Sequence, residues 1–363
     1  MRKILCIHQS AELYGSDRSF LSAIQGLKEK NIIDVILPFH GDLAEYIKKE
    51  KIDISYFNNG ILRKKDILNP IVFFWGVIKG VVYYANEYKK YDVIYINTIV
   101  MLSAIIAASF QKNKKIYCHV REIPSKKIIS IFRLLFRLSS VALIYNSEAT
   151  KSAFGLPGTV IYNGVPAITN LRKNTVACND VINILLIGRI NTWKGQSFFV
   201  DAFLSYLRKF KKSPFRVKIV GSAFAGYEYL EQELRNKILT ENISEYIELI
   251  PFINNPTELF QWADYIIVPS TKPEPFGRVA VEAFSAGKPV IAANHGGLKE
   301  IVDDGFNGYL FEPNSIESLV TTLDTLKKNE LSVYKLMCEN AIMTFKQKFS
   351  LEKYQELICD TLK

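Results

Sequence analysis

The first half of the chain alternates short apolar runs with longer stretches whose apolar residues recur at helical spacing. The short runs predict β-strands, and the longer stretches predict α-helices. We expect strands at residues 3–8, 33–38, 93–97, 115–120, 142–146 and 159–162, and helices at 18–29, 43–51, 101–110 and 128–138. Strands that alternate with helices favour a mainly parallel sheet with helices on its faces. This half is therefore predicted to be a doubly wound α/β domain.

A polar stretch at residues 166–180 interrupts the pattern and is typical of a linker. A second alternation follows it, with strands expected at 182–187, 216–220, 247–251, 265–269, 290–293 and 308–311, and helices at 195–210, 227–239, 257–262, 276–286, 297–302 and 316–328. A length of 363 residues also favours two domains. We predict Rossmann-like domains at 1–168 and 180–345, with a C-terminal helix at 346–363 that is a candidate to return to the first domain. Such domains bind ligands at the carboxyl ends of their strands, so we expect a ligand between them.

The composition, 48% hydrophobic and 23% charged, is that of a folded globular protein. No C-x-x-C pair occurs among the five cysteines, which favours reduced thiols over a disulfide framework or a zinc site; they are Cys6, Cys118, Cys178, Cys338 and Cys359. The N-terminal apolar run is too short for a signal peptide. The longest apolar stretch, 71–84, contains Lys79 and is shorter than the about 20 residues that span a bilayer. We therefore expect a cytoplasmic protein.

The net charge of +10 is concentrated in the first half, where residues 1–175 hold 25 Lys and Arg against 13 Asp and Glu, while the remainder holds 21 against 23. This asymmetry indicates an anionic partner: a membrane surface, a phosphorylated lipid or nucleic acid. Residues 126–138 combine an apolar face with Arg133 and Arg137 one turn apart. They fit a helix lying on the inner face of an anionic membrane, which would make the protein peripheral, or a helix packed on the sheet.

Two glutamates flank a predicted helix start in the second domain. Strand 265–269 leads into Pro273-Glu274-Pro275, and a helix is expected to open near Phe276-Gly277. Glu274 then lies just before the helix N-terminus and Glu282 in its second turn, about 8 Å away. A helix N-terminus binds phosphate, and flanking carboxylates accept hydrogen bonds from hydroxyls. The alternative is that Glu274 only caps the helix and Glu282 is a solvated surface residue.

Two cations follow the first strand of the second domain. Strand 182–187 ends in Gly188-Arg189, and Lys194-Gly195 opens the next helix. An open α/β sheet binds its ligand at this edge, where Arg189 can hold a phosphate with two donors and Lys194 adds a point charge. An ordinary strand-to-helix junction is the alternative for this run taken alone.

Together these features resemble the GT4 family of retaining glycosyltransferases, which have the GT-B fold. The resemblance is carried by the GR-x4-KG junction, the EPFG-x4-EA segment with Glu274 and Glu282 in E-x7-E spacing, the Gly296-Gly297 turn and the Asn163-Gly164-Val165 hinge. It implies an enzyme that transfers a sugar from a nucleotide-sugar donor to an acceptor hydroxyl with retention of configuration. The implied fold is α/β, with two Rossmann-like domains facing across a cleft.

The resemblance also implies roles for individual residues. Glu274 would meet hydroxyls of the donor sugar, Glu282 would bond the ribose, and Arg189 and Lys194 would neutralise the departing diphosphate. The remaining donor-binding positions implied around the helix start are Phe276, Gly277, Arg278 and Val279.

In the first domain the resemblance is weaker. In the family, a Gly-Gly pair after the first strand lets the backbone approach the phosphate. This sequence has Gly15 and Ser16 there, so the resemblance implies that Gly15 and the small Ser16 would bind phosphate. An ordinary turn with Asp17 as helix cap is the alternative. Family members often place a histidine beside the reacting centre, which here would be His119, and the alternative is a packed structural histidine.

The sequence contains no D-x-D motif, so we expect no cofactor and no essential metal, with the cations neutralising the diphosphate. The expected acceptor is a glycan or a lipid-linked glycan in surface polysaccharide synthesis. One rival is a nucleotide-sugar epimerase of GT-B type, which would need further acid and base groups. A basic module that binds membrane or nucleic acid ranks last, because the carboxylates would repel a phosphate backbone; we expect no nucleic-acid partner.

Overall fold

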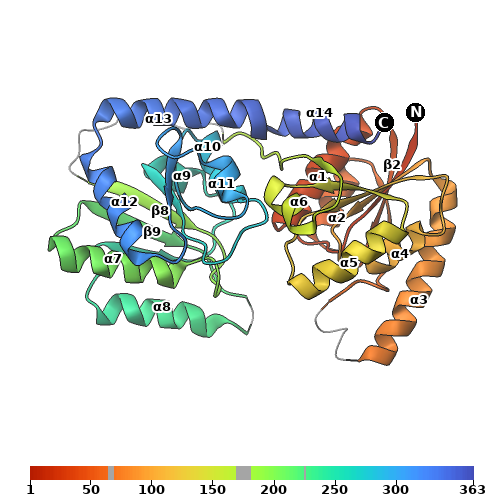
Figure 1. Ribbon diagram of the computed structural model, residues 1–363, viewed down its shortest axis with the longest axis horizontal. Helices are drawn as coiled ribbons and strands as arrows, with labels where there is room; N and C mark the ends of the chain where they lie inside the picture. Colours follow the sequence, from red (N-terminus) through yellow and green to blue (C-terminus); the bar gives the residue numbers. More distant parts are fainter. Residues whose placement is uncertain (64–68, 169–180, 225) are drawn as a thin grey trace. The chain divides into compact units, whose positions relative to one another are not determined.

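The structure, a computed structural model, describes residues 1–63, 69–168, 181–224 and 226–363. The chain divides into two compact units (Figure 1). The first contains Met1–Gly164 and Leu351–Lys363, and the second contains Val165–Ser350. Most of the predicted linker, residues 169–180 with Cys178, lies outside the described residues.

The first unit is built on a parallel sheet with strand order β3-β2-β1-β4-β5-β6-β7. Its strands are β1 (Lys3–Ile7), β2 (Ile32–Leu37), β3 (Asp53–Tyr56), β4 (Val93–Asn97), β5 (Lys115–Val120), β6 (Val141–Tyr145) and β7 (Thr159–Val160). Its helices are α1 (Gly15–Lys28), α2 (Asp42–Lys49), α3 (Pro70–Glu87), α4 (Leu102–Ala108), α5 (Lys126–Leu138), α6 (Glu148–Phe154) and α14 (Leu351–Thr361), with a 3-10 turn at Tyr88–Lys90.

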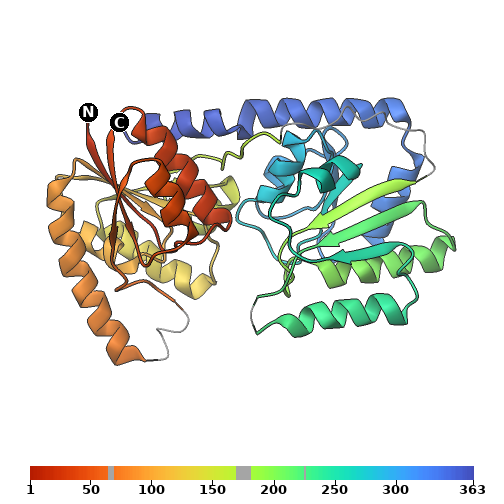
Figure 2. The same ribbon diagram turned by 180° about the vertical axis from the view of Figure 1, so that it is seen from behind.

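The alternation of side chains along these strands builds two cores, one on each face of the sheet. Leu5 and Ile7 pack with the side chains of α3, α4 and α5. Ile4 and Cys6 point to the other face and pack with α1, α2 and α14. Helices α4 and α5 therefore lie in front of the sheet in Figure 1, and α1 comes to the front when the molecule is turned (Figure 2). Both faces are covered, as expected for a parallel sheet.

The second unit repeats this strand order in its own sheet, β10-β9-β8-β11-β12-β13, again all parallel. Its strands are β8 (Ile182–Ile187), β9 (Phe215–Val220), β10 (Ile247–Ile250), β11 (Tyr265–Val268), β12 (Val290–Ala293) and β13 (Gly308–Phe311). Its helices are α7 (Gln196–Phe210), α8 (Glu228–Thr240), α9 (Thr257–Trp262), α10 (Arg278–Ser285), α11 (Leu298–Ile301), α12 (Ile316–Lys328) and α13 (Leu331–Thr344), followed by a π-helical turn at Phe345–Phe349.

The shared strand order fixes where each unit can bind a ligand. In both sheets the order reverses between the first and fourth strands, β1 and β4 in the first unit and β8 and β11 in the second. The loops that leave these neighbouring strands run to opposite faces and open a crevice at their carboxyl ends. The prediction of an α/β fold with two doubly wound, Rossmann-like halves is confirmed.

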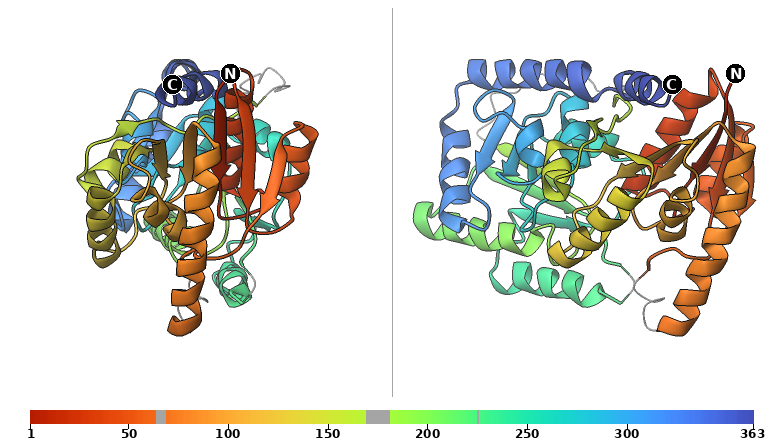
Figure 3. Two further views of the ribbon diagram at one scale, coloured as in Figure 1. Left: turned by 90° about the vertical axis from the view of Figure 1, so that its right-hand side faces the viewer. Right: turned by 45° about the vertical axis from the view of Figure 1, so that its right-hand side comes forward.

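The C-terminal helix packs on the first unit, and one glycine explains the close approach. A Cβ at Gly26 of α1 would lie 2.7 Å from Cβ of Gln355 in α14. Across the same contact Tyr354 Oη donates to the Ser19 carbonyl at 3.1 Å, and Gln355 Nε2 donates to the Ser22 carbonyl at 3.0 Å. Figure 3 shows α14 (dark blue) beside α1 (red). The helix expected over 346–363 is thus shorter, because a π-helical turn precedes it.

Several element predictions need correction. Helix α1 begins at Gly15 rather than residue 18, and α10 begins at Arg278 rather than residue 276, because Gly277 has a φ of +122° that no helix accommodates. The sequence pattern missed β3, α3, α6 and α13. Strand β3 is short and largely exposed, α6 is short, and α13 does not sort its apolar residues to one side. No helix within the described ranges has the length and apolar character needed to cross a bilayer.

Candidate active site

The loop between β8 and α7 carries the predicted cations and folds against the end of β11. Asn191 Oδ1 accepts hydrogen bonds from the backbone N–H groups of Trp193 (3.0 Å) and Lys194 (2.8 Å), which turns the loop. Gly195 then has a φ of +81°, and a Cβ there would lie 1.8 Å from the Pro269 carbonyl oxygen. Only glycine fits this position. The approach brings Lys194 to the loop that contains Glu274.

Lys194 and Glu274, which the sequence predicted to share a site, are in direct contact. Lys194 Nζ lies 2.8 Å from Glu274 Oε1, and the Ser270 hydroxyl donates to the same oxygen. Glu274 is only 5% exposed, whereas the Lys194 side chain keeps 21% of its surface exposed. A buried carboxylate is therefore held by one partly exposed cation at the reversal point of the sheet.

The Gly296-Gly297 turn supports the backbone around Glu274. The Gly297 N–H donates to the Glu274 carbonyl at 2.8 Å. Gly296 has a φ of +59°, and a Cβ there would lie 2.4 Å from the same carbonyl oxygen. His295, beside this turn, has its Nε2 2.7 Å from the Ser270 carbonyl oxygen. These contacts give the glycine pair a structural role in placing Glu274.

Glu282 forms a second ion pair on α10. Arg278 Nε donates to Glu282 Oε1 at 2.8 Å, one helical turn apart, and both side chains are largely buried. Arg278 and Val279 are the first residues of α10, where backbone N–H groups have no partner within the helix. Phe276, before the helix, is buried, and its ring packs edge-on against that of Phe349. The two glutamates thus flank a helix N-terminus, and each has its own cation.

Arg189 lies at the start of the same β8 loop but contacts a different element. Its guanidinium carbon is 3.3 Å from the centre of the Phe224 ring, in the loop that follows β9. The preceding residue, Gly188, has a φ of +154° with open space where a Cβ would project. Arg189 therefore stacks on an aromatic face.

In the first unit, Gly15 and Ser16 form the first turn of α1, with Tyr14 as N-cap residue. Asp17 Oδ2 accepts from the Tyr14 N–H at 2.9 Å, and Asp17 Oδ1 lies 2.6 Å from His8 Nε2. Asp17 therefore caps the N-terminus of α1, as the alternative interpretation expected, although it does so from the third helical position (N3) and not as the N-cap residue. The N–H groups of Gly15 and Ser16 lie at the positive end of the helix, which is where an anion would bind.

His119 is completely buried at the end of β5. Tyr95 Oη lies 2.8 Å from its Nδ1 and Arg121 Nη2 lies 3.2 Å from it. Because both groups can donate to Nδ1, the imidazole proton belongs on Nε2, which has no hydrogen-bond partner within the described residues. Burial, and then the Arg121 cation, hold the pKa of His119 well below its usual range. His119 is a neutral side chain in this geometry, and its catalytic role stays a prediction.

Arg121 organises the polar core of the first unit, and the sequence reasoning did not single it out. It is 6% exposed, and its guanidinium donates to Asn97 Oδ1 (2.6 Å), Asn163 Oδ1 and Tyr354 Oη (2.9 Å). Asn97 Nδ2 in turn lies 2.8 Å from His8 Nδ1. The signal that selected Arg189, a cation just after a predicted strand, also applies to Arg121, which follows β5. The network joins the strand ends, the last residues before the unit boundary, and α14.

Within the described ranges, no group of three His, Cys, Asp or Glu side chains is arranged to hold a metal ion.

The fold, with its two doubly wound units, defines a class of protein, that of GT-B structures. The solved structure of HepE from Anabaena in complex with UDP and glucose covers 100% of this chain with a TM-score of 0.80 and 25% sequence identity, and 99% of HepE is covered in turn. Residues 168–343 match the family model of glycosyl transferases group 1, so this part of the chain is similar to that family.

Two curated relatives are similar to this chain over a little more than half of its length. An uncharacterized glycosyltransferase of Methanocaldococcus jannaschii is 34% identical over 53% of this chain and 50% of its own length. The lipopolysaccharide 1,2-N-acetylglucosaminetransferase of Salmonella typhimurium is 30% identical over 58% of this chain and 60% of its own length. The chain thus matches about half the length of these relatives.

Proposed function

We propose that this protein is a retaining glycosyltransferase that moves a sugar from a nucleotide-sugar donor to an acceptor hydroxyl. The observation that carries the proposal is the contact between Lys194 and Glu274 at the reversal point of the second sheet. A cation from the β8 loop there meets a buried carboxylate that lies 80 residues further along the chain, shortly before the N-terminus of α10. This combination suits a ligand that has both phosphate and hydroxyl groups.

In the proposed complex, the donor lies along the start of α10. Both contacts of Glu274 end on Oε1, so Oε2 is the oxygen that would accept from sugar hydroxyls. Lys194 has three N–H donors and can hold Glu274 and a phosphate oxygen together. Arg189 would add two donors to the diphosphate, and Glu282 would accept from the ribose. The N–H groups at Gly277, Arg278 and Val279 would supply further donors to phosphate, and those at Gly15 and Ser16 are the candidate anion site of the first unit.

The reaction breaks the bond between the anomeric carbon and the diphosphate oxygen and forms one from that carbon to the acceptor oxygen. The electron pair of the broken bond stays on the nucleotide diphosphate, where Lys194, Arg189 and the helix end stabilise it. The acceptor proton passes to a phosphate oxygen of the leaving group, on the face that this group vacates. These side chains neutralise the diphosphate, so we propose that no metal is essential.

UDP-sugars are the donors to test first. HepE was solved with UDP and glucose, and the Salmonella relative is named for transfer of N-acetylglucosamine to lipopolysaccharide. These names support a UDP-sugar donor and a glycan or lipid-linked glycan acceptor in surface polysaccharide synthesis.

The test is a thermal-shift screen of the full chain with UDP-, GDP- and dTDP-sugars, followed by turnover with the best binder. Transfer should persist in EDTA, and NMR of the product should show the anomeric configuration of the donor. Lys194→Ala should lose activity, while Lys272→Ala, an exposed lysine in the loop of Glu274, should not. Conversion of the donor alone into a new nucleotide sugar would instead identify an epimerase.

A further inference from the structure

Helix α3 presents large apolar side chains to solvent along its first half. Ile71 is 72% exposed and Trp75 is 58% exposed. The other exposed apolar residues of the helix are Val72, Phe74, Ile78 and Val82. Tyr84, near the end of the helix, is by contrast completely buried in the core of the sheet. One end of α3 therefore anchors the helix, and the other leaves an apolar surface exposed, which is unusual for a surface helix.

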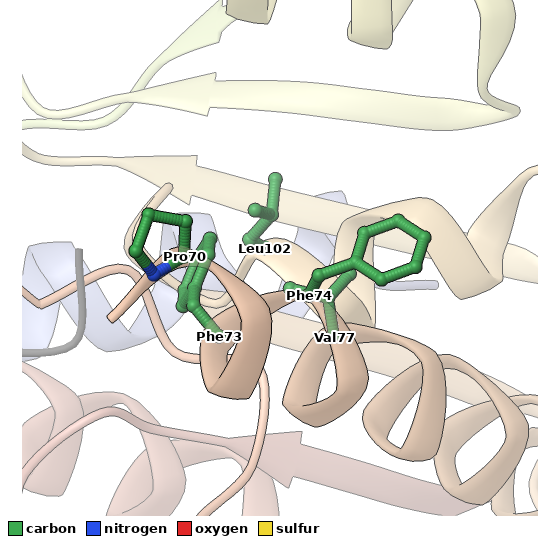
Figure 4. Close-up of a pocket in the computed structure, with 5 residues that line it drawn as sticks. All are labelled: Pro70, Phe73, Phe74, Val77 and Leu102. Atoms are coloured by element: carbon green, nitrogen blue, oxygen red, sulfur yellow. The ribbon is translucent and has the colours of Figure 1, made fainter. Parts of the chain in front are cut away.

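A pocket opens beside this exposed half. It has a volume of about 340 Å³ and is lined by Pro70, Phe73, Phe74 and Val77 of α3 and by Leu102 at the start of α4 (Figure 4). Every lining side chain is apolar. The pocket therefore suits a hydrocarbon group, because the lining side chains offer a ligand no hydrogen-bond donor or acceptor.

Helix α5 adds a second exposed apolar row on the same side of the sheet. Its inner face packs into the core that also holds the end of α3, and α4 contacts both helices. Its outer face exposes Ile131 to 65% and Leu138 to 69%, with Ile128 and Leu134 also exposed. The inner face of residues 126–138 is thus packed on the sheet, as one of the two alternatives expected, and contact of the outer face with a membrane stays a prediction.

This side of the unit is also strongly basic. Residues 63–137, which include α3, α4 and α5, hold 14 Lys and Arg against 4 Asp and Glu. The exposed cations on the two helices are Lys79, Lys126, Lys127 and Arg137. Arg133, which the sequence suggested for membrane contact, instead donates to the carbonyls of Ala153 and Phe154 at the end of α6. The charge available to a partner therefore comes from the other four residues.

We propose that the first half of α3 and the outer face of α5 form a docking surface for an anionic lipid bilayer, with the pocket beside Phe73 taking a lipid hydrocarbon chain. Apolar side chains bordered by cations match the layers of a bilayer surface, where acyl chains lie beneath anionic headgroups. A second copy of this chain would bring the same positive charge to the contact and be repelled. The surface does not rest on the proposed reaction, although it would bring the protein to a lipid-linked acceptor.

The test is sedimentation of the full chain with vesicles of phosphatidylglycerol and phosphatidylcholine in equal amounts, with pure phosphatidylcholine for comparison. Trp75→Ser/Ile78→Ser removes apolar surface, and Lys126→Glu/Lys127→Glu reverses charge; all four residues are exposed, so the fold should persist. The matched control is Leu336→Ser, which alters a residue of the second unit that is also 58% exposed.

Wild type and the control should bind anionic vesicles, more weakly at high salt. Each cation near an anionic surface is worth about a fivefold change in affinity, so the charge variant should bind more than tenfold more weakly. The apolar variant should lose a similar factor even at low salt, and the donor thermal shift should be unchanged in both variants. Failure of wild type to bind, or binding unaffected by the apolar variant, would overturn the proposal. So would a wild-type dimer in light scattering that this variant dissociates.

Discussion

Removing the Lys194 side chain tests whether the cation serves the reaction or only its neighbour Glu274. Loss of one partner of a fully buried ion pair costs about 3–5 kcal/mol, and loss of an exposed pair costs less than about 1 kcal/mol. Glu274 is 5% exposed and the Lys194 side chain 21%. We therefore expect Lys194→Ala to destabilise the protein by about 2 kcal/mol, which corresponds to about 4–8 °C in Tm for a domain of this size.

The rate should fall by more than this structural effect explains. A preorganised donor that faces developing negative charge is worth about 10²–10³ in kcat. Glu274→Gln removes the carboxylate charge that Lys194→Ala leaves unpaired, so the double variant should recover Tm relative to Lys194→Ala. Its kcat should not recover, because the diphosphate still lacks its cation.

Differential scanning fluorimetry and initial-rate kinetics on the same four proteins (wild type, the two single variants and the double variant) measure both quantities. Lys272→Ala is the control for loss of a lysine in this loop. A double variant that regained the rate, or a Lys194→Ala protein with near-normal kcat, would refute the assignment of Lys194 to the leaving group.

Three further predictions concern the scaffold. Gly296→Ala should lower kcat through displacement of Glu274, because its Cβ would lie 2.4 Å from that carbonyl oxygen; Gly226→Ala, with a similar positive φ but no atom within 4 Å, is the control. Burial raises the pKa of Glu122 to about 7, so the folded carboxyl keeps a proton that the unfolded chain releases near pH 4.3, and this group lowers stability as pH rises from about 4 to about 7. Glu122→Gln should remove this group's contribution to the slope of unfolding free energy against pH. The buried histidines, whose pKa is lowered, contribute a slope of the opposite sign in both proteins. Subtracting the pH curve of the variant from that of wild type, both measured by urea unfolding, therefore isolates the contribution of Glu122. Tyr354→Phe should cost about 1–3 kcal/mol in urea unfolding, because its hydroxyl joins a buried guanidinium to α1.

The sequence predicted the elements that repeat a strong pattern. The predicted strand 265–269 begins with a continuous apolar run, because a parallel sheet buries both of its faces, and the structure has β11 at Tyr265–Val268. Contacts between loops could be predicted only where a family motif places both residues in one site. The resemblance grouped Lys194 with Glu274, and the spacing of four residues between Arg278 and Glu282 was a signal for their ion pair that the sequence analysis did not use.

The elements that the sequence missed are those stabilised by tertiary packing or left exposed. Residues 71–84 were considered only as a membrane span, since an apolar stretch without helical periodicity does not reveal that α3 is anchored at one end alone. The network around Arg121 was missed because its partners Asn97, Asn163 and Tyr354 come from distant parts of the chain. Such a network becomes visible only when the sheet order is known.

The two units use the same strand order for different purposes. In the first, His8 after β1 and Arg121 after β5 are sealed from solvent, and both hydrogen-bond to Asn97 at the end of β4. Buried charge of this kind fixes the backbone but cannot reach a ligand. In the second unit the equivalent edge keeps Lys194 partly exposed beside a helix N-terminus. The second unit thus keeps a cation accessible at this edge, whereas the polar groups at the strand ends of the first unit are held in a buried network.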